Sequence, residues 1–263
     1  MHNQVQRPHY GVDAPGPTGF FLSAGGVMLV IFFALILTPF SVNTWVRIFG
    51  GLSAIAAAYF LGMGCLMLYF SKVTKLKERE KLLNLIDWSG RELVLDVGCG
   101  RGLMLVGAAK RLSSGKAIGI DIWQQKDQSK NSPSAALANA EFESVKDRVE
   151  VATADMRRLP FPGNHFDVVV SNWAVHNLEL EIDRQNALSE IVRVLKPGGV
   201  VVLSDIAHQT QYAEYLGECG MVDVQLHSNA LRDSILRPLT HGNYVPSAVS
   251  ARKAAPIQFA SAT

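Results

Sequence analysis

Apolar residues are concentrated in two long runs near the N-terminus. Residues 20–40 contain no charged side chain, and residues 45–70 contain only one, Arg47. Each run is close to the ~20 residues that an α-helix needs to cross a ~30 Å hydrocarbon core. Because only a few polar residues separate the two runs, the pattern predicts an antiparallel pair of transmembrane helices over residues 20–70.

The segments that flank this hairpin are polar. Residues 1–19 are expected to be irregular, and residues 71–91 to form a basic connector and helix. By the positive-inside rule, the basic cluster marks the cytoplasmic side of the membrane, and an even number of spans places the N-terminus there too. A signal peptide fits poorly because a second apolar run follows the first, whereas a buried hairpin of a globular core remains an alternative. The cluster consists of Lys72, Lys75, Lys77, Arg79 and Lys81.

Small residues recur every four positions in the second run, at Gly50, Ala54, Ala58 and Gly62. Such a stripe would let the first helix approach closely. It would also permit the hairpin to associate with a second copy of the chain, so a homo-oligomer is a possible partner state.

Residues 92–254 show a different pattern, in which short apolar runs alternate with amphipathic segments. This alternation predicts a Rossmann-like α/β domain, a doubly wound seven-stranded sheet with helices on both faces. Residues 255–263 are left as a C-terminal tail. The expected strands are 92–97, 117–122, 148–152, 166–170, 200–204, 222–226 and 248–253, and the expected helices are 103–112, 134–146, 183–195 and 211–219, with a turn at 196–199.

Composition changes this picture only in part. The chain is 48% hydrophobic and 18% charged, with a net charge of +2 and a mean hydropathy of +0.15. The shortage of charge belongs mainly to residues 20–70. A near-neutral chain without a dense basic patch argues against nucleic-acid substrates. The 3 cysteines show no paired metal-ligand spacing, so no metal site is expected.

A glycine-rich turn follows the first expected strand. Gly98, Gly100 and Gly102 alternate there, and glycine lets the backbone bend sharply and approach a ligand. A dinucleotide fingerprint would need its third glycine at position 103, which is Leu103. Asp96 precedes the turn, where a carboxylate suits a cationic ammonium better than a pyrophosphate.

Two further acids lie at strand ends. Asp121 closes the second strand, where a carboxylate can accept hydrogen bonds from a ribose diol. Asp155 follows the third strand and could accept from an adenine amino group. Each acid alone also fits a helix cap or a surface residue. Together with Asp96, however, they describe a site for a positively charged adenosine compound.

These segments together resemble a known family. The motifs VLDVGCGRG, GIDIW, ATADMRRLPF, FDVVVSNWAVHNL and LKPGGVVVLSDI are similar to those of the class I S-adenosylmethionine (SAM)-dependent methyltransferases, of the branch that acts on small molecules and lipids. The resemblance covers roughly residues 82–253 and leaves out the two apolar runs. It implies SAM as the cofactor and S-adenosylhomocysteine as the product.

The resemblance also implies a role for individual residues. Asp96 would meet the methionine ammonium, Asp121 would bind both ribose hydroxyls, and Asp155 would take the adenine N6 amine. The other residues implied in cofactor binding are Gly98, Cys99, Gly100 and Gly102 along the methionine chain, Ile122, Trp123 and Met156 around the adenine, and Asn172 and Trp173 in the wall between cofactor and acceptor.

Methyl transfer needs mainly alignment, and some acceptors must also lose a proton. His176 is a candidate general base because imidazole titrates near neutral pH, and His208 is a second candidate. His176 could equally cap a helix or satisfy a core hydrogen bond. Tyr212 and Tyr215 are expected on a helix that often covers the acceptor in this family, although they could be ordinary packing aromatics.

The sequence argues against some classes of methyl acceptor and favours others. The turn after the fourth strand, Ser171-Asn172-Trp173-Ala174, lacks the N-P-P-Y-like motif of amide and adenine N-methyltransferases. The predicted hairpin suggests a lipid, quinone or other hydrophobic acceptor at the cytoplasmic membrane face, because tethering raises the local concentration of a lipophilic molecule. Two alternatives stay open: a SAM-binding regulator without turnover, and a methyltransferase of a soluble molecule whose hairpin serves only localisation or oligomerisation.

Overall fold

The computed structural model describes residues 8–38, 43–124, 128–229, 233–234, 237–238 and 246–255. The chain divides into two compact units. The hairpin unit comprises Gly11–Lys77 and Gln124–Lys130, and the sheet unit comprises Met1–Tyr10, Glu78–Trp123 and Asn131–Thr263. The chain therefore passes between the units four times, and each unit is described by itself.

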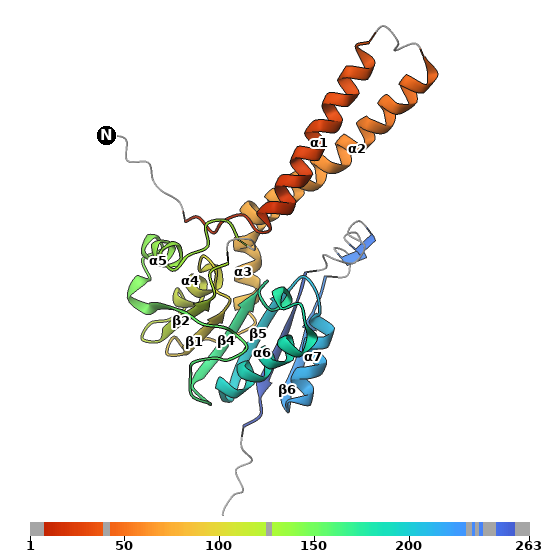
Figure 1. The fold of residues 1–263 in the computed structure, drawn as a ribbon. Helices are drawn as coiled ribbons and strands as arrows, with labels where there is room; N and C mark the ends of the chain where they lie inside the picture. The colour runs from red at the N-terminus through yellow and green to blue at the C-terminus, as the bar shows by residue number, and fades with distance from the viewer. Residues whose placement is uncertain are drawn as a thin grey trace, which may run out of the picture. The chain divides into compact units, whose positions relative to one another are not determined.

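The hairpin unit is built on two long helices (Figure 1), α1 (Pro15–Ile36) and α2 (Thr44–Tyr69). Both are long and apolar enough to cross a membrane, by length and composition. Helix α1 begins within the segment that was expected to be irregular, because proline is tolerated in the first turn of a helix. The side chain of Asn43 caps α2 by accepting from the backbone N–H of Trp45 at 2.9 Å.

The two helices pack through glycines, only partly along the stripe predicted from the sequence. A Cβ at Gly25 would lie 2.6 Å from Leu61 Cγ, and one at Gly64 would lie 2.6 Å from Leu22 Cδ2. Gly50 of the predicted stripe is buried at this contact, whereas Ala58 and Gly62 are exposed, because a four-residue repeat drifts around a helix of 3.6 residues per turn. The buried positions of α2 follow a mixed three- and four-residue spacing and are Gly50, Ser53, Ala57 and Gly64.

The base of the hairpin is closed by polar contacts. Asp13, just before α1, forms an ion pair with Lys75 at 2.8 Å, and its backbone N–H donates to Ser71 Oγ at 3.2 Å. Ser71 lies in a π-helical turn, η1 (Phe70–Thr74), which follows α2. The start of α1 and the end of α2 are therefore side by side, as an antiparallel pair requires.

The sheet unit contains seven strands in the order β3-β2-β1-β4-β5-β7-β6. The first five are parallel, and β7 pairs antiparallel with both β5 and β6. This topology confirms the predicted Rossmann-like doubly wound fold. The strands are β1 (Leu93–Val97), β2 (Lys116–Asp121), β3 (Val149–Thr153), β4 (Phe166–Asn172), β5 (Leu195–Asp205), β6 (Met221–His227) and β7 (Ser247–Lys253).

Helices cover both faces of this sheet (Figure 1). Residues of β1 alternate between the faces: Val94 packs with α4 (Leu103–Ala109) and Leu95 with α6 (Glu181–Val194). The first face also receives α5 (Pro133–Phe142) and the end of α3 (Lys75–Leu83), and the second receives α7 (Gln209–Glu218). Full burial of an aliphatic side chain contributes about 1.5–3 kcal/mol to the free energy of folding. The two clusters therefore hold the strands, and with them the loops at their carboxyl ends, in place.

Strand β5 is longer than the sequence predicts. Residues 196–199, expected to be a turn, lie inside β5, beside a register shift between Phe166 and Val168 of β4. A Cβ at Gly199 would lie 2.9 Å from Asp167 O, so glycine permits the close approach of these two strands. Two short 3₁₀ turns complete the described elements, η2 (Lys146–Arg148) and η3 (Val175–Asn177).

Candidate active site

The glycine-rich turn connects β1 to α4 in a conformation that requires glycine. Gly98, Gly100 and Gly102 have φ angles of 72°, 52° and 82°, which L-residues with a side chain rarely adopt. A Cβ at Gly98 would also lie 2.3 Å from Ala174 Cβ. Cys99, between these glycines, is buried, and burial raises the pKa of its thiol, as expected for a packing residue.

Asp96 is the most deeply buried acid of this turn. It is 1% exposed, and neither of its carboxylate oxygens has a hydrogen-bond partner among the described residues. Burial raises the pKa of Asp96 to about 8, the backbone N–H of Leu105 acts against this shift, and the nearby charge of Asp121 adds to it. A buried carboxyl with so little compensation is costly unless a cation meets it, so this site fits the ammonium group of SAM.

Asp121 ends β2 and organises the turn through both oxygens. Its Oδ2 accepts the backbone N–H of Gly100 at 2.8 Å. Its Oδ1 accepts the N–H of Trp123 at 2.6 Å and the Nδ2 donor of Asn131 at 3.2 Å. The predicted ribose-binding carboxylate thus also holds the protein's own loops, a role that the sequence reasoning missed.

The predicted adenine-binding residues follow β2 and β3. Asp155 accepts from the Arg157 guanidinium, with Nη2 at 2.6 Å, and this pairing lowers the pKa of Asp155. Trp123 donates from Nε1 to Thr153 Oγ1 at 2.8 Å, and Ile122 is 50% exposed. Met156 is half-buried. Their predicted roles stay predictions, with Asp155 engaged by an arginine in this structure.

Left-handed backbone recurs where these strands end. Trp123 follows β2 with φ 61°, Trp173 follows β4 with φ 55°, and His208 follows β5 with φ 67°. Positive φ at non-glycine residues is uncommon and gathers at functional sites. The backbone N–H of Trp173 donates to Ser204 O at 2.8 Å, so the loop that begins after Asn172 is tied to the end of β5.

His176 and Asp205 form a close pair near these strand ends. His176 lies in η3, and its Nδ1 is 2.5 Å from Asp205 Oδ1. Asp205 ends β5, is 1% exposed, and accepts the backbone N–H of His176 through Oδ2 at 3.0 Å. An aspartate beside one ring nitrogen can orient an imidazole and fix its tautomer; in this structure the contact at Nδ1 is close but lacks hydrogen-bond geometry, and the backbone N–H makes the hydrogen bond. The sequence reasoning missed Asp205, although it ends a strand just as Asp121 does.

The other predicted acceptor-side residues follow β5, and each hydrogen-bonds to another side chain of the protein. Tyr212 is buried, and its hydroxyl donates to Asp205 Oδ2 at 3.3 Å. Burial and the charge of Asp205 raise the pKa of Tyr212, so it remains a neutral donor. Tyr215 shares a hydrogen bond with Ser189 at 2.8 Å. His208 Nδ1 lies 3.1 Å from Gln211 Oε1.

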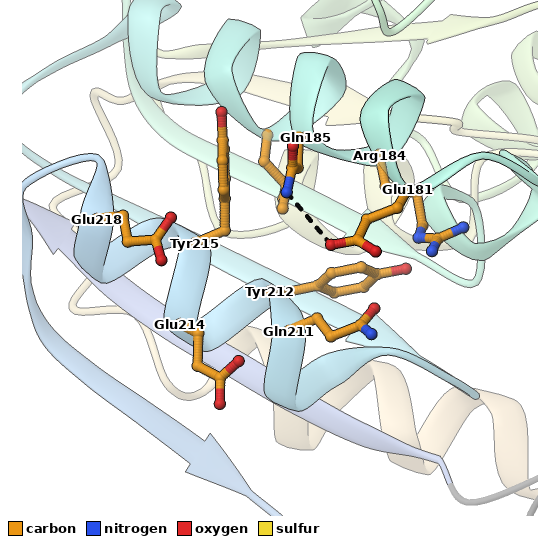
Figure 2. Close-up of a pocket in the computed structure, with 9 residues that line it drawn as sticks. Glu181, Arg184, Gln185, Gln211, Tyr212, Glu214, Tyr215 and Glu218 are labelled. Carbon is orange, nitrogen blue, oxygen red and sulfur yellow. Dashed lines mark hydrogen bonds between the residues drawn. The ribbon is translucent and has the colours of Figure 1, made fainter.

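A separate pocket lies between α6 and α7 (Figure 2). Tyr212 and Tyr215 line it, but none of the predicted cofactor-binding residues does. Figure 2 shows polar side chains of both helices around it, among them Glu181, Glu214 and Glu218. The two predicted acceptor-side tyrosines therefore line a different cavity from the glycine-rich turn, and their acceptor role stays a prediction.

Comparisons with known proteins agree with this fold. Residues 95–203 match the family described as methyltransferase domain. A demethylmenaquinone methyltransferase of Symbiobacterium thermophilum is 40% identical over 107 residues, which is 40% of this chain and 39% of that one. A demethylmenaquinone methyltransferase of Lactiplantibacillus plantarum is 32% identical over 136 residues, 51% of this chain and 53% of that one. The chain thus spans about half the length, or less, of these relatives.

A solved structure shows the same architecture. The crystal structure of a SAM-dependent methyltransferase from Aquifex aeolicus superposes with a TM-score of 0.51 at 22% identity, over 68% of this chain and 91% of that one. At this identity the likeness concerns the fold. The sheet order and the glycine-rich turn agree with the methyltransferase-domain family, which residues 95–203 match.

Proposed function

We propose that this protein binds SAM and transfers its methyl group to a small lipophilic acceptor, of the quinone type, at a membrane. The observation that carries the proposal is Asp96, a carboxyl with 1% exposure and two oxygens without partners among the described residues, directly before a turn of three left-handed glycines. A site of this kind is costly for the fold, and a bound ammonium would offset that cost.

The glycine-rich turn, Asp121 and Asp155 would complete the cofactor site. The bound cofactor supplies a methyl group already activated on a sulfonium. Gly98 and Gly100 give the turn its left-handed backbone. Asp121 retains acceptor capacity for a ribose hydroxyl, because an ionised carboxylate has about four lone-pair sites. Asp155 would exchange part of its pairing with Arg157, which is solvent-exposed, for the adenine amine.

The chain's own chemical contribution would be a proton transfer. A hydroxyl of the acceptor in its hydroquinone form would give its proton to Nε2 of His176. The oxygen, or the ring carbon that the deprotonated oxygen activates, would take the methyl group, and the sulfonium would leave as a neutral thioether; a ring carbon would then lose its hydrogen as a second proton. Asp205 would act as a positioning residue, since it holds Nδ1 and stabilises the imidazolium that forms. Its contact of 2.5 Å with Nδ1 already exists in this structure.

The lipophilic acceptor is inferred from two observations. Both curated relatives described above are demethylmenaquinone methyltransferases, and the chain carries two helices of membrane-spanning length and composition. A catalytic domain anchored in a bilayer meets acceptors dissolved in that bilayer at high local concentration.

We also infer that the catalytic domain and the N-terminus lie on the cytoplasmic side. Of the five basic residues after the second run, Lys72 and Lys77 are exposed. Lys75 pairs with Asp13, and Arg79 is buried and pairs with Glu80 at 2.8 Å. The positive-inside rule therefore acts here mainly through Lys72, Lys77 and the exposed Lys81.

The test uses the full-length protein in lipid nanodiscs with labelled SAM. Saturable SAM binding and label transfer to a demethylated quinone would support the proposal. Asp121→Asn is a better binding variant than Asp121→Ala, because asparagine keeps one acceptor for the Gly100 N–H. Binding without any release of S-adenosylhomocysteine would favour the regulator alternative.

A further inference from the structure

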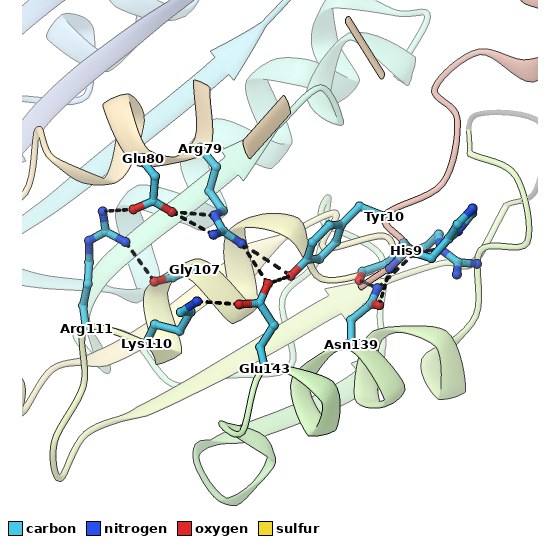
Figure 3. Close-up of polar contacts among 10 residues, drawn as sticks. His9, Tyr10, Arg79, Glu80, Gly107, Lys110, Arg111, Asn139 and Glu143 are labelled. Atoms are coloured by element: carbon cyan, nitrogen blue, oxygen red, sulfur yellow. Dashed lines mark hydrogen bonds and ion pairs between the residues drawn. The ribbon is translucent and has the colours of Figure 1, made fainter. Parts of the chain in front are cut away.

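The chain segment that precedes α1 is bonded to the cofactor-binding turn through main-chain atoms (Figure 3). The N–H of His9 donates to Asn139 Oδ1 at 2.9 Å, and Asn139 Nδ2 donates back to His9 O at 3.1 Å. Arg101 Nε donates to the same carbonyl at 2.6 Å. Arg101 stands between Gly100 and Gly102 in the turn. The backbone of His9 is therefore held by the turn and by α5 together.

Asn139 is the common element of these contacts. Its Nδ2 also donates to the carbonyl of Arg101 at 2.9 Å, and the residue is 5% exposed. One buried amide thus bridges the main chain of the turn and the main chain of the N-terminal segment. Removal of this side chain would take this partner from the His9 N–H and from the Arg101 carbonyl and would leave the His9 carbonyl to Arg101 Nε, which is costlier than the loss of a surface contact.

Tyr10 anchors the next position of the segment. It is 6% exposed, and its hydroxyl donates to Glu143 Oε1 at 2.7 Å. Arg79 Nη1 lies 3.4 Å from the same hydroxyl and 3.6 Å from Glu143 Oε1, and Lys110 pairs with the other carboxylate oxygen at 2.5 Å. Figure 3 shows this network joining the segment to α3, α4 and α5. A fully satisfied buried network of this kind specifies one geometry.

The segment makes further bonds two residues later, within the hairpin unit. The N–H of Val12 donates to Ser129 Oγ at 3.1 Å, and the N–H of Ser129 donates to Val12 O at 3.3 Å. Asp13 forms an isolated antiparallel bridge with Gln128. Residues 128 and 129 belong to the loop that starts directly after Trp123. These bonds hold Val12 and Asp13 within the hairpin unit.

We propose that His9 and Tyr10 form a strap that positions the SAM-binding turn within the sheet unit, with Asn139 as its positioning residue. The inference rests on the proposed function, because it takes the turn around Gly98–Gly102 as the SAM site. The strap holds Arg101 and Asn139 in one arrangement, so SAM meets a preorganised turn. Because linkage is reciprocal, bound SAM must stabilise the strap by the same factor.

The test compares full-length variants in nanodiscs. Asn139→Ala removes all three bonds of the amide, and Asn139→Asp keeps the acceptor for His9 N–H while removing both donated bonds. Glu141→Ala is the matched control, since Glu141 lies on the same helix and its carboxylate pairs with Lys146 at the exposed surface. We expect SAM to bind about tenfold more weakly to Asn139→Ala, and less weakly to Asn139→Asp, with Glu141→Ala unchanged.

Hydrogen exchange on the wild-type protein gives a readout that needs no variant. Saturating SAM is expected to slow exchange at the His9 amide, whose acceptor is Asn139 Oδ1. A purely structural strap would show no such response. If the wild type binds SAM but the His9 amide is unaffected and Asn139→Ala retains its affinity, the strap inference is overturned. If the wild type fails to bind SAM, the proposed function itself fails.

Discussion

Nδ1 of His176 lies 2.5 Å from Oδ1 of Asp205, and the second oxygen of that carboxylate accepts the backbone N–H of the same histidine. This pairing joins the loop after β4 to the end of β5. The Asp205 carboxylate also accepts hydrogen bonds from the Tyr212 hydroxyl and from the N–H of Ile206. These bonds hold the carboxylate in place beside the imidazole.

The first prediction concerns this dyad. His176→Gln is expected to lower kcat by on the order of 10²–10⁴-fold, because a general base contributes that much, while SAM affinity stays the same. Asp205→Asn should lower kcat as well, because the amide cannot stabilise the imidazolium. Methyl-transfer rates with a phenolic acceptor and SAM titrations measure the two effects separately. Loss of activity in His208→Gln, with His176→Gln active, would assign the base to His208 instead.

The second prediction concerns Asp96 and pH. Its folded pKa of about 8 lies above the ordinary value of 3.8. The unfolded state therefore loses the proton first, and the stability of the ligand-free protein should fall as pH rises from about 4 to 8, by up to about 1.4 kcal/mol per unit. Asp96→Asn removes this dependence. Thermal unfolding of both proteins at pH 5 and pH 8 measures this dependence. If Asp96→Asn raises the melting temperature by the same amount at both pH values, the raised pKa of Asp96 is refuted.

The same carboxyl should make SAM binding pH-dependent. A protonated Asp96 must ionise to meet an ammonium group, so SAM affinity should rise by on the order of tenfold between pH 6 and 7.5 in the wild type. Asp96→Asn should bind weakly and with little dependence on pH. Isothermal titration in two buffers of different ionisation enthalpy would also detect the released proton.

The fourth prediction compares two glycines. Gly98→Ala combines a φ of 72° with a Cβ contact of 2.3 Å to Ala174, so it should destabilise the sheet unit by about 1–3 kcal/mol and abolish SAM binding. Gly217→Ala is the control, because a Cβ in that helical position has nothing within 4 Å. It should be neutral or stabilise by up to about 1 kcal/mol. Chemical unfolding and SAM titration distinguish them.

The fifth prediction concerns the hairpin. Gly64→Val would drive a side chain into Leu22, whereas Gly62→Val points into open space. We expect only Gly64→Val to separate α1 from α2, which cysteine cross-linking or spin-label distances between the helices would report. If Gly62→Val disturbs the pair instead, the packing face described above is incorrect. If Gly62→Val leaves the hairpin intact but dissociates an oligomer, the exposed small residues serve self-association.

The sequence was sufficient for the fold of the sheet and for the glycine-rich turn. Buried parallel strands are continuous apolar runs, and left-handed turns require glycine, so both leave a direct signal in the residue types. Asp205 was missed because its role depends on the contact between two loops. Arg79 was read as part of a basic surface, yet it is buried against Tyr10 and Glu143. The strap was missed because His9 binds through main-chain atoms, which any residue carries.

The structure also changes how the hairpin should be tested. Deletion of residues 1–70 would remove Tyr10 and the main-chain partners of Asn139 along with the two apolar helices. Loss of activity in that deletion would therefore not separate acceptor access from damage to the cofactor site. Replacement of residues 20–36 and 45–69 by unrelated apolar helices, with residues 8–14 kept, retains the strap and tests the anchor alone.

The most direct test of the central claim is a labelled-methyl assay with the full-length protein in nanodiscs made from a membrane lipid extract. The account predicts saturable SAM binding, release of S-adenosylhomocysteine and label in an organic-soluble quinone-type product, all lost in Asp96→Asn. Label found only in a water-soluble product, at a rate independent of the lipid, would contradict the lipophilic acceptor. Absence of SAM binding in the folded wild type would contradict the account as a whole.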